Sequence, residues 1–170
     1  FDSYIGSPCG LEVFTFGNPW EELNLSGYTY TSFDGATAES MPGQHNPNVE
    51  GGGITNLSDY AKLLEIHLNG GYCGETQVLT EASLASMRQD RGSLTFNPTP
   101  YGMGWWISSN EPGLYTDGGA FGAVSFLDVN TGIGGFIAID DYTQRASGQG
   151  SAMLSIALPL IQEAVRARYE

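Results

Sequence analysis

The feature that most constrains the fold of this chain is the stretch YTDGGAFGAVSFLDVNTGIGGFIAIDD, residues 115–141. It contains the adjacent glycines Gly118 and Gly119, followed by two apolar segments that are joined by Asn-Thr-Gly. Apolar segments of strand length on either side of a short glycine-containing turn are typical of an antiparallel hairpin. Together with the aromatic run before it, the stretch predicts strands at about 101–108, 113–117, 123–129 and 133–140.

Three helices are predicted outside these strands, at about 56–68, 81–88 and 149–168. Thr55 or Asn56 is expected to cap the first helix and Thr80 the second. Pro159 removes one backbone hydrogen bond from the last helix and is expected to bend it. Apolar spacing predicts the buried faces of the first and last helices. They comprise Leu57, Tyr60, Ala61, Leu64 and Leu68 in the first, and Met153, Ala157, Leu160, Ile161 and Ala164 in the last.

The order of these elements indicates an α+β fold, with an antiparallel sheet of about three to five strands, a C-terminal helix and two further helices. The length of 170 residues fits one domain. Within it, we distinguish a loop-rich lead-in at 1–50, a helical segment at 51–92, and the sheet with the terminal helix at 100–170. A short strand is predicted at 26–33 in the lead-in.

Charge and cysteine content limit the partners and the compartment. The chain carries 19 acidic and 6 basic residues, a formal net charge of −13, so no basic surface for nucleic acid is expected. No apolar run approaches the roughly 20 residues of a membrane span. Cys9 and Cys73, the only cysteines, suit either one disulfide or two unrelated buried thiols. We expect a secreted or periplasmic protein, and the start at Phe1 suggests a processed or truncated product.

Four segments of the chain follow one another in a recognisable order. They are VEGGGITNLSDYAKLLEIHLNGG (49–71), QVLTEASLASM (77–87), YGMGWWI (101–107) and TDGGAFGAVSFLDVNTGIGGFIAID (116–140). In this order they resemble the serine β-lactamase-like family, which contains class C β-lactamases, D,D-peptidases (penicillin-binding proteins) and related esterases. The resemblance implies acyl transfer to a serine, without a cofactor, and the C-terminal part of a β-lactamase-like fold.

The last segment resembles the third motif of that family, Lys-Thr-Gly or His-x-Gly on an edge strand that pairs with the substrate. Thr116 falls at the Lys or His position, Asp117 at the variable position and Gly118 at the motif glycine. The resemblance then assigns to Gly119 the N–H that helps to hold the oxyanion. Thr116 cannot offer a positive charge to a substrate carboxylate, which favours neutral esters or amides over β-lactams.

The nucleophile motif of the family, Ser-x-x-Lys, does not occur in the 170 residues, and neither does its Tyr-x-Asn motif. In the family both motifs precede the segments found here. The chain is therefore expected to be the C-terminal half of a longer serine hydrolase and to be inactive alone. Its expected partners are the missing N-terminal part and a small acyl substrate. The alternative is a non-catalytic homologue or binding module with the same fold.

Further expectations concern the surroundings of the site. Tyr115, Trp105 and Trp106 are candidates to border the cleft, and strand alternation would send only one of the two tryptophans there. His45 and His67 belong to no recognised metal-ligand spacing, and no metal is expected. The sheet edge that meets N-terminal strands in the family is expected to be bare, which predicts a dimer through that edge.

Overall fold

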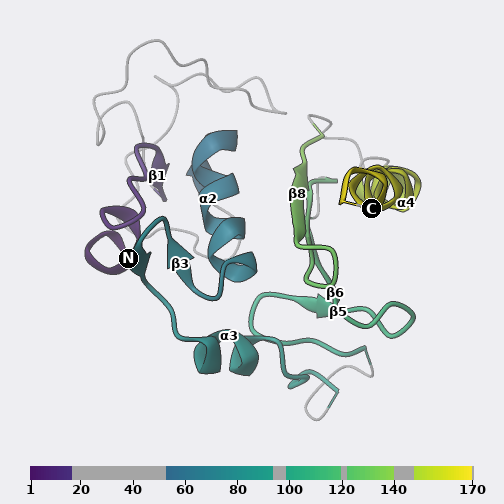
Figure 1. The fold of residues 1–170 in the computed structure, drawn as a ribbon, viewed down its shortest axis with the longest axis horizontal. Helices are drawn as coiled ribbons and strands as arrows, with labels where there is room; N and C mark the ends of the chain where they lie inside the picture. Colours follow the sequence, from purple (N-terminus) through teal and green to yellow (C-terminus); the bar gives the residue numbers. More distant parts are fainter. Residues whose placement is uncertain (17–52, 94–98, 120–121, 140–147, 170) are drawn as a thin grey trace.

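A computed structural model of the chain describes residues 1–16, 53–93, 99–119, 122–139 and 148–169. A four-stranded antiparallel sheet lies between helix α2 (Leu57–Leu68) and helix α4 (Gln149–Tyr169), as Figure 1 shows. Helix α3 (Glu81–Met87) lies beyond one end of this arrangement. The predicted α+β class is confirmed. The strand predicted at 26–33 and the loop residue His45 lie outside the described residues.

The sheet is a meander of β5 (Trp106–Ile107), β6 (Leu114–Gly118), β7 (Val124–Asp128) and β8 (Ile133–Ile137), in that order. All neighbouring strands are antiparallel. The predicted Asn-Thr-Gly turn joins β7 to β8, and Gly132 takes the positive φ of 68° that this turn needs. The three longer strands therefore lie where the apolar segments predict them.

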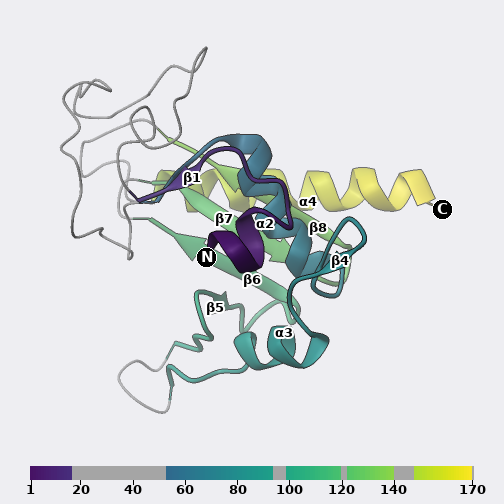
Figure 2. The ribbon, with the colours of Figure 1, turned by 90° about the vertical axis from the view of Figure 1, so that its left-hand side faces the viewer.

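Alternation along β7 divides the core into two clusters, one on each face of the sheet. Leu127 packs with Leu64 of α2 on one face, and Val124 packs with Leu154 of α4 on the other. Figure 2 shows α2 and α4 on opposite sides of the strands. All five residues of β7 are buried, because helices cover both of its faces.

The first two helices begin where their caps predict. The side chain of Asn56 accepts a hydrogen bond from the Asp59 N–H at 2.8 Å, and the hydroxyl of Thr80 accepts one from the Ser83 N–H at 3.1 Å. The predicted buried stripe of α2 is correct at Leu64 but wrong at Leu57, which is 70% exposed. Leu57 is the first residue of the helix and lines an open groove between α2 and β8, where solvent reaches it.

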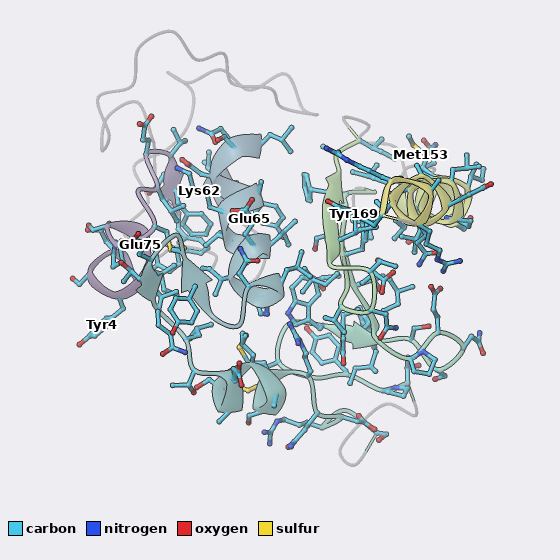
Figure 3. The ribbon with its side chains drawn as sticks, in the orientation of Figure 1. Tyr4, Lys62, Glu65, Glu75, Met153 and Tyr169 are labelled. Atoms are coloured by element: carbon cyan, nitrogen blue, oxygen red, sulfur yellow. A yellow bond between two sulfur atoms is a disulfide. The ribbon has the colours of Figure 1, made fainter. Side chains whose placement is uncertain are left out.

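The last helix is confirmed, but its predicted buried face is wrong. Met153 is 52% exposed and Leu160 is 62% exposed. Figure 3 shows Met153 on the outside of α4. The face toward the sheet instead comprises Gly150, Leu154, Leu158 and Gln162. A Cβ at Gly150 would lie 1.9 Å from the Gly122 carbonyl oxygen, so only glycine permits this approach of α4 to the sheet. A small residue and an amide thus set the rotation of the helix.

The strand predicted at 101–108 is largely replaced by a turn. Only β5 joins the sheet, and Tyr101 forms an isolated bridge with Trp106. Between them Gly104 adopts a φ of 81°, and the Gly102 N–H donates to the Trp105 carbonyl at 2.8 Å. The glycines at 102 and 104 therefore fold this segment back on itself and shorten the edge strand of the sheet.

Residues 1–16 pack beside α2 and include the helical turn η1 (Asp2–Gly6), which the sequence does not predict. Two small sheets flank α2. One pairs β1 (Phe14–Thr15) with β2 (Ile54–Thr55), and the other pairs β3 (Tyr72–Cys73) with β4 (Thr76–Gln77). A disulfide joins Cys9 to Cys73 with an S–S distance of 2.04 Å.

The buried carboxylate of Asp59 connects this N-terminal segment to α2. It accepts hydrogen bonds from the N–H groups of Glu12 and Val13 at 2.9 and 2.7 Å, and from Lys62 at 2.9 Å. Lys62 also donates to the Gly10 carbonyl at 2.5 Å, and Figure 3 shows it on the side of α2 that faces this segment. Burial alone would raise the pKa of Asp59, but these hydrogen bonds outweigh burial and lower it.

We predict that Asp59→Ala lowers the free energy of unfolding by about 2–4 kcal/mol, because it leaves buried donors without an acceptor. Glu65→Ala, an exposed acidic position on the same helix, is the matched control and should change stability by less than about 0.5 kcal/mol. Urea denaturation of both variants measures the difference. Equal losses in the two variants would contradict this role of Asp59.

Candidate functional site

The sheet edge at β6 is open at its C-terminal end. β5 pairs with β6 only at Tyr115 and Thr116, and no described strand lies beside Asp117 or Gly118 on that side. The Ser108 N–H donates to the Leu114 carbonyl at 3.0 Å, so the peptide groups of Leu114, and of every second residue after it, face this side. The N–H and C=O of Gly118 therefore lie at the open edge. A Cβ built on Gly118 would meet nothing within 4 Å.

Gly119 has a different environment from the one that the motif suggests. Its N–H donates to the Ala123 carbonyl at 2.8 Å, and its carbonyl accepts from the Gly122 N–H at 3.1 Å. Both groups are used within the turn toward β7. Among the described residues, the N–H that points to the open edge is therefore that of Gly118, one residue earlier than the motif places it. Both Gly118 and Gly119 are exposed.

The strand register places the side chains of Thr116 and Asp117 on opposite faces of the sheet. Thr116 lies opposite Phe126, which belongs to the cluster beneath α4. Asp117 lies opposite Ser125, whose hydroxyl donates to the Asp117 carbonyl at 3.4 Å. Because residues directly opposite each other share a face, Thr116 faces α4 and Asp117 faces α2. The charged side chain of the motif is thus an acid on the α2 face.

Ser125, directly opposite Asp117, places a hydroxyl group on this face. Tyr60 of α2 lies on the same face, and its ring centre is 4.8 Å from that of Phe136. Burial, followed by the charge of Asp117, raises the pKa values of Tyr60 and Tyr101. Desolvation raises the pKa of Asp117 itself, although the residue as a whole is exposed. From the sequence, Tyr60 is predicted only to lie on the buried face of the first helix. The alternation Val-Ser-Phe at 124–126 is the one sequence pattern that indicates that Ser125 faces away from its two apolar neighbours, toward α2.

The three aromatic candidates lie in two environments. Trp105 is buried beside Leu64 and Leu127, whereas Trp106 is half-buried and its ring lies 4.6 Å from that of Tyr101. Tyr115 is half-buried on the α2 face. The two tryptophans are thus divided between core and partial exposure, as alternation requires. The cleft-border roles of the three residues stay predictions.

Arg88 and His67 contact each other beside Tyr115. The Arg88 guanidinium lies 5.6 Å from the Tyr115 ring centre and hydrogen-bonds the carbonyl of His67. The His67 ring lies edge-on to Trp105, with ring centres 5.3 Å apart. Burial, aided by the charge of Arg88, lowers the pKa of His67 to about 4. His67 is therefore a neutral packing residue at pH 7.

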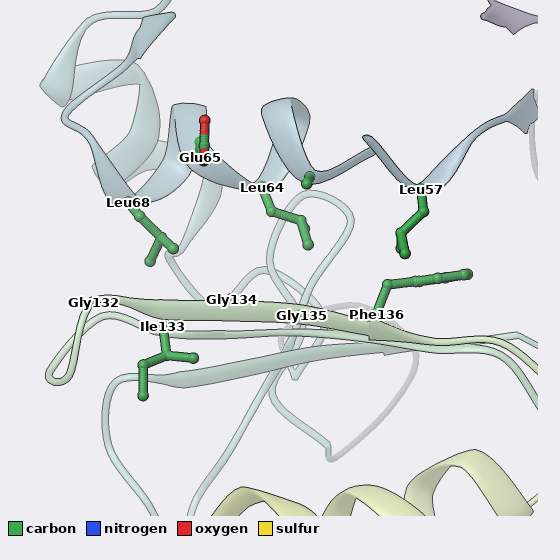
Figure 4. Close-up of a pocket in the computed structure, with 10 residues that line it drawn as sticks. Leu57, Leu64, Glu65, Leu68, Gly132, Ile133, Gly134, Gly135 and Phe136 are labelled. Carbon is green, nitrogen blue, oxygen red and sulfur yellow. The ribbon is translucent and has the colours of Figure 1, made fainter. Parts of the chain in front are cut away.

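An apolar groove with a volume of about 330 Å³ lies between α2 and β8, on the α2 face of the sheet. Figure 4 shows Leu57, Leu64 and Leu68 reaching down from the helix, with Phe136 rising from the strand. Gly134 and Gly135 form part of its floor. Glu65 is the one charged residue of the lining. The groove is distinct from the open edge of β6, because β7 separates the two strands.

Within the parts of the chain that the structure describes, no group of acidic, histidine or cysteine side chains could hold a metal ion. The same parts contain no helix with the length and hydrophobicity of a membrane span.

No protein-family model and no curated protein sequence matches the chain. Solved structures do match its fold, among them the following three. A candidate β-lactamase from Bacteroides dorei matches with a TM-score of 0.62 and 20% identity. The alignment covers 95% of this chain and 50% of the β-lactamase. EstCE1, a hydrolase with promiscuous acyltransferase activity, has a TM-score of 0.61 and 17% identity, with coverages of 88% and 47%. An octameric penicillin-binding protein homologue from Pyrococcus abyssi has a TM-score of 0.60 and 18% identity, with coverages of 94% and 36%.

The chain has a β-lactamase-like fold. The resemblance that the sequence motifs predict is confirmed at the level of the fold. The chain spans between about a third and a half of the length of these structures. Their fold thus includes a further part of comparable or greater size.

We predict that His67 makes stability depend on pH between about 6.5 and about 4. Because the folded pKa lies below the unfolded value, the unfolded chain binds more protons in this window. The stabilisation is complete above pH 6.5 and is lost as the pH falls toward 4, by roughly 2–3 kcal/mol. Denaturation of His67→Gln across this range should lack that slope, and His45→Gln, the control, should keep it. A slope that survives in His67→Gln would contradict the assignment.

Proposed function

We propose that the chain is the C-terminal part of a serine hydrolase of the β-lactamase and penicillin-binding-protein-like type. The observation that carries this proposal is the open edge of β6 at Gly118 within a β-lactamase-like fold. An acyl compound would lie along this edge and pair with the peptide groups of the strand, as an added strand does. The N–H of Gly118 would stabilise the negative charge that develops on the carbonyl oxygen.

The nucleophile and its base would come from residues outside this chain. The chain has no Ser-x-x-Lys, and its only lysine, Lys62, is held by Asp59 and the Gly10 carbonyl. Its own contribution is the substrate strand and the wall formed by the α2 face. The chain alone is accordingly expected to be inactive.

The outer edge of β8 supports the proposal that a further part of the protein packs here. β8 lies between α2 and α4 in Figure 1, and no described strand pairs with its outer edge. Both helices expose apolar side chains, among them Leu57 on α2 and Ile156 and Leu160 on α4. Edges and apolar faces of this kind are normally covered by another part of the protein.

The longer protein that contains this chain should hydrolyse a chromogenic ester, and the chain alone should not. Replacing the serine of its Ser-x-x-Lys motif should reduce kcat about a million-fold. Gly118→Pro removes the edge N–H and should reduce kcat about 100- to 1000-fold, whereas Gly118→Ala, the control, should keep most activity. Thermal melting confirms that both variants fold.

No turnover of either a chromogenic ester or a chromogenic β-lactam by the longer protein would overturn the proposal. The alternative, a non-catalytic binding module with this fold, would then be favoured. The threonine at position 116, where the family has Lys or His, is the observation that favours this alternative.

We also predict that the chain alone dimerises by pairing the outer edges of β8 from two copies. Sedimentation velocity over a hundred-fold range of concentration should show a monomer–dimer equilibrium. The longer protein, in which this edge would be covered, is the control and should not self-associate through it. A monomer at every concentration of the chain alone would contradict this prediction.

A further inference from the structure

Among the described residues of β6, the one charged side chain is that of an acid, at the open end of the strand. Asp117 is exposed, lies on the α2 face by its register with Ser125, and precedes the open peptide groups of Gly118. Its neighbours on this face are hydroxyl groups, which contribute no formal charge near neutral pH. An acyl compound that lay along this edge would therefore place its substituents beside a carboxylate.

Among the described residues, Asp117 makes no salt bridge. Two of the basic side chains have other partners, since Lys62 binds Asp59, while Arg88 lies over Tyr115 and donates to the carbonyl of His67. The raised pKa of Asp117 is what a partly desolvated carboxyl without a cationic neighbour should have. A bound cation would supply the missing charge.

We propose that Asp117 is a specificity-determining residue that selects acyl compounds carrying a cationic group, such as an ammonium or guanidinium. This inference rests on the proposed function and names the substrate class of the same site. A substrate carboxylate would be repelled at this position, whereas an amine would form a charge-assisted hydrogen bond. The selected compounds are amino-substituted esters or amides.

The size of the expected preference follows from the exposure of Asp117. A hydrogen bond to a charged group can change binding by tenfold or more, but an exposed pair lies at the weak end of that range. We therefore expect a cationic ester to exceed its neutral analogue roughly tenfold in kcat/KM. Because the pair is exposed to solvent, the preference should shrink as salt concentration rises.

The test uses the longer protein and three p-nitrophenyl esters whose acyl chains have equal length and end in an ammonium, a hydroxyl or a carboxylate. The expected order of kcat/KM is ammonium, hydroxyl, carboxylate. In Asp117→Asn, the kcat/KM values for the ammonium and hydroxyl esters should become similar, and the value for the hydroxyl ester should stay nearly that of the wild type. Asp117→Glu should keep the preference, and Asp117→Lys should reverse it. Glu163→Gln, an exposed acid on α4, is the control and should behave as the wild type.

The possible results separate this inference from the proposed function. Equal hydrolysis of the three esters, or a preference that survives Asp117→Asn in a folded variant, would overturn the role of Asp117 and leave the hydrolase proposal intact. An absence of turnover with all three esters would overturn the hydrolase proposal, and the inference would fall with it. A preference that is lost in Asp117→Asn and retained in Asp117→Glu would support both.

Discussion

The burial of β7 between two helices sets the register of the whole sheet. Its five residues alternate between a cluster under α2 and a cluster under α4, and all of them are excluded from water. A slip of one residue in its pairing would exchange the two faces, so each set of side chains would meet the wrong helix and both clusters would lose their packing. The same register fixes β6 beside it, so the hydrophobic core also decides that Asp117 faces α2 and Thr116 faces α4.

Polar groups complete what the apolar clusters begin. The buried carboxylate of Asp128, at the end of β7, accepts hydrogen bonds from the Asn130 N–H, the Thr131 hydroxyl and the Gln162 amide. Burial alone would raise its pKa, but these donors lower it. Asp128 thereby connects the β7–β8 turn to α4, much as Asp59 connects the N-terminal segment to α2. Two members of a strongly acidic chain thus act as internal anchors.

The sequence predicts those features that follow from local patterns. The caps at Asn56 and Thr80 and the apolar strands of the meander lie where they are expected, because each depends on residues near in sequence. The buried face of α4 could not be predicted from apolar spacing. It is fixed by the close approach of Gly150 to Gly122 and by the hydrogen bond from Gln162 to Asp128, and neither glycine nor glutamine contributes to an apolar pattern. At the site, the motif points to β6, but the directions of the Gly118 and Gly119 peptide groups depend on hydrogen bonds across the sheet, which local patterns do not predict.

The bond between Cys9 and Cys73 makes a covalent ring of the chain between them, 64 positions apart in sequence. If a protease cut one peptide bond inside this ring, the two pieces would still be joined through sulfur. Electrophoresis would then display a single band until a reducing agent was added. In an oxidising environment, a nicked copy would keep both its η1 end and its helices in one particle, so cleavage and dissociation would be separate events.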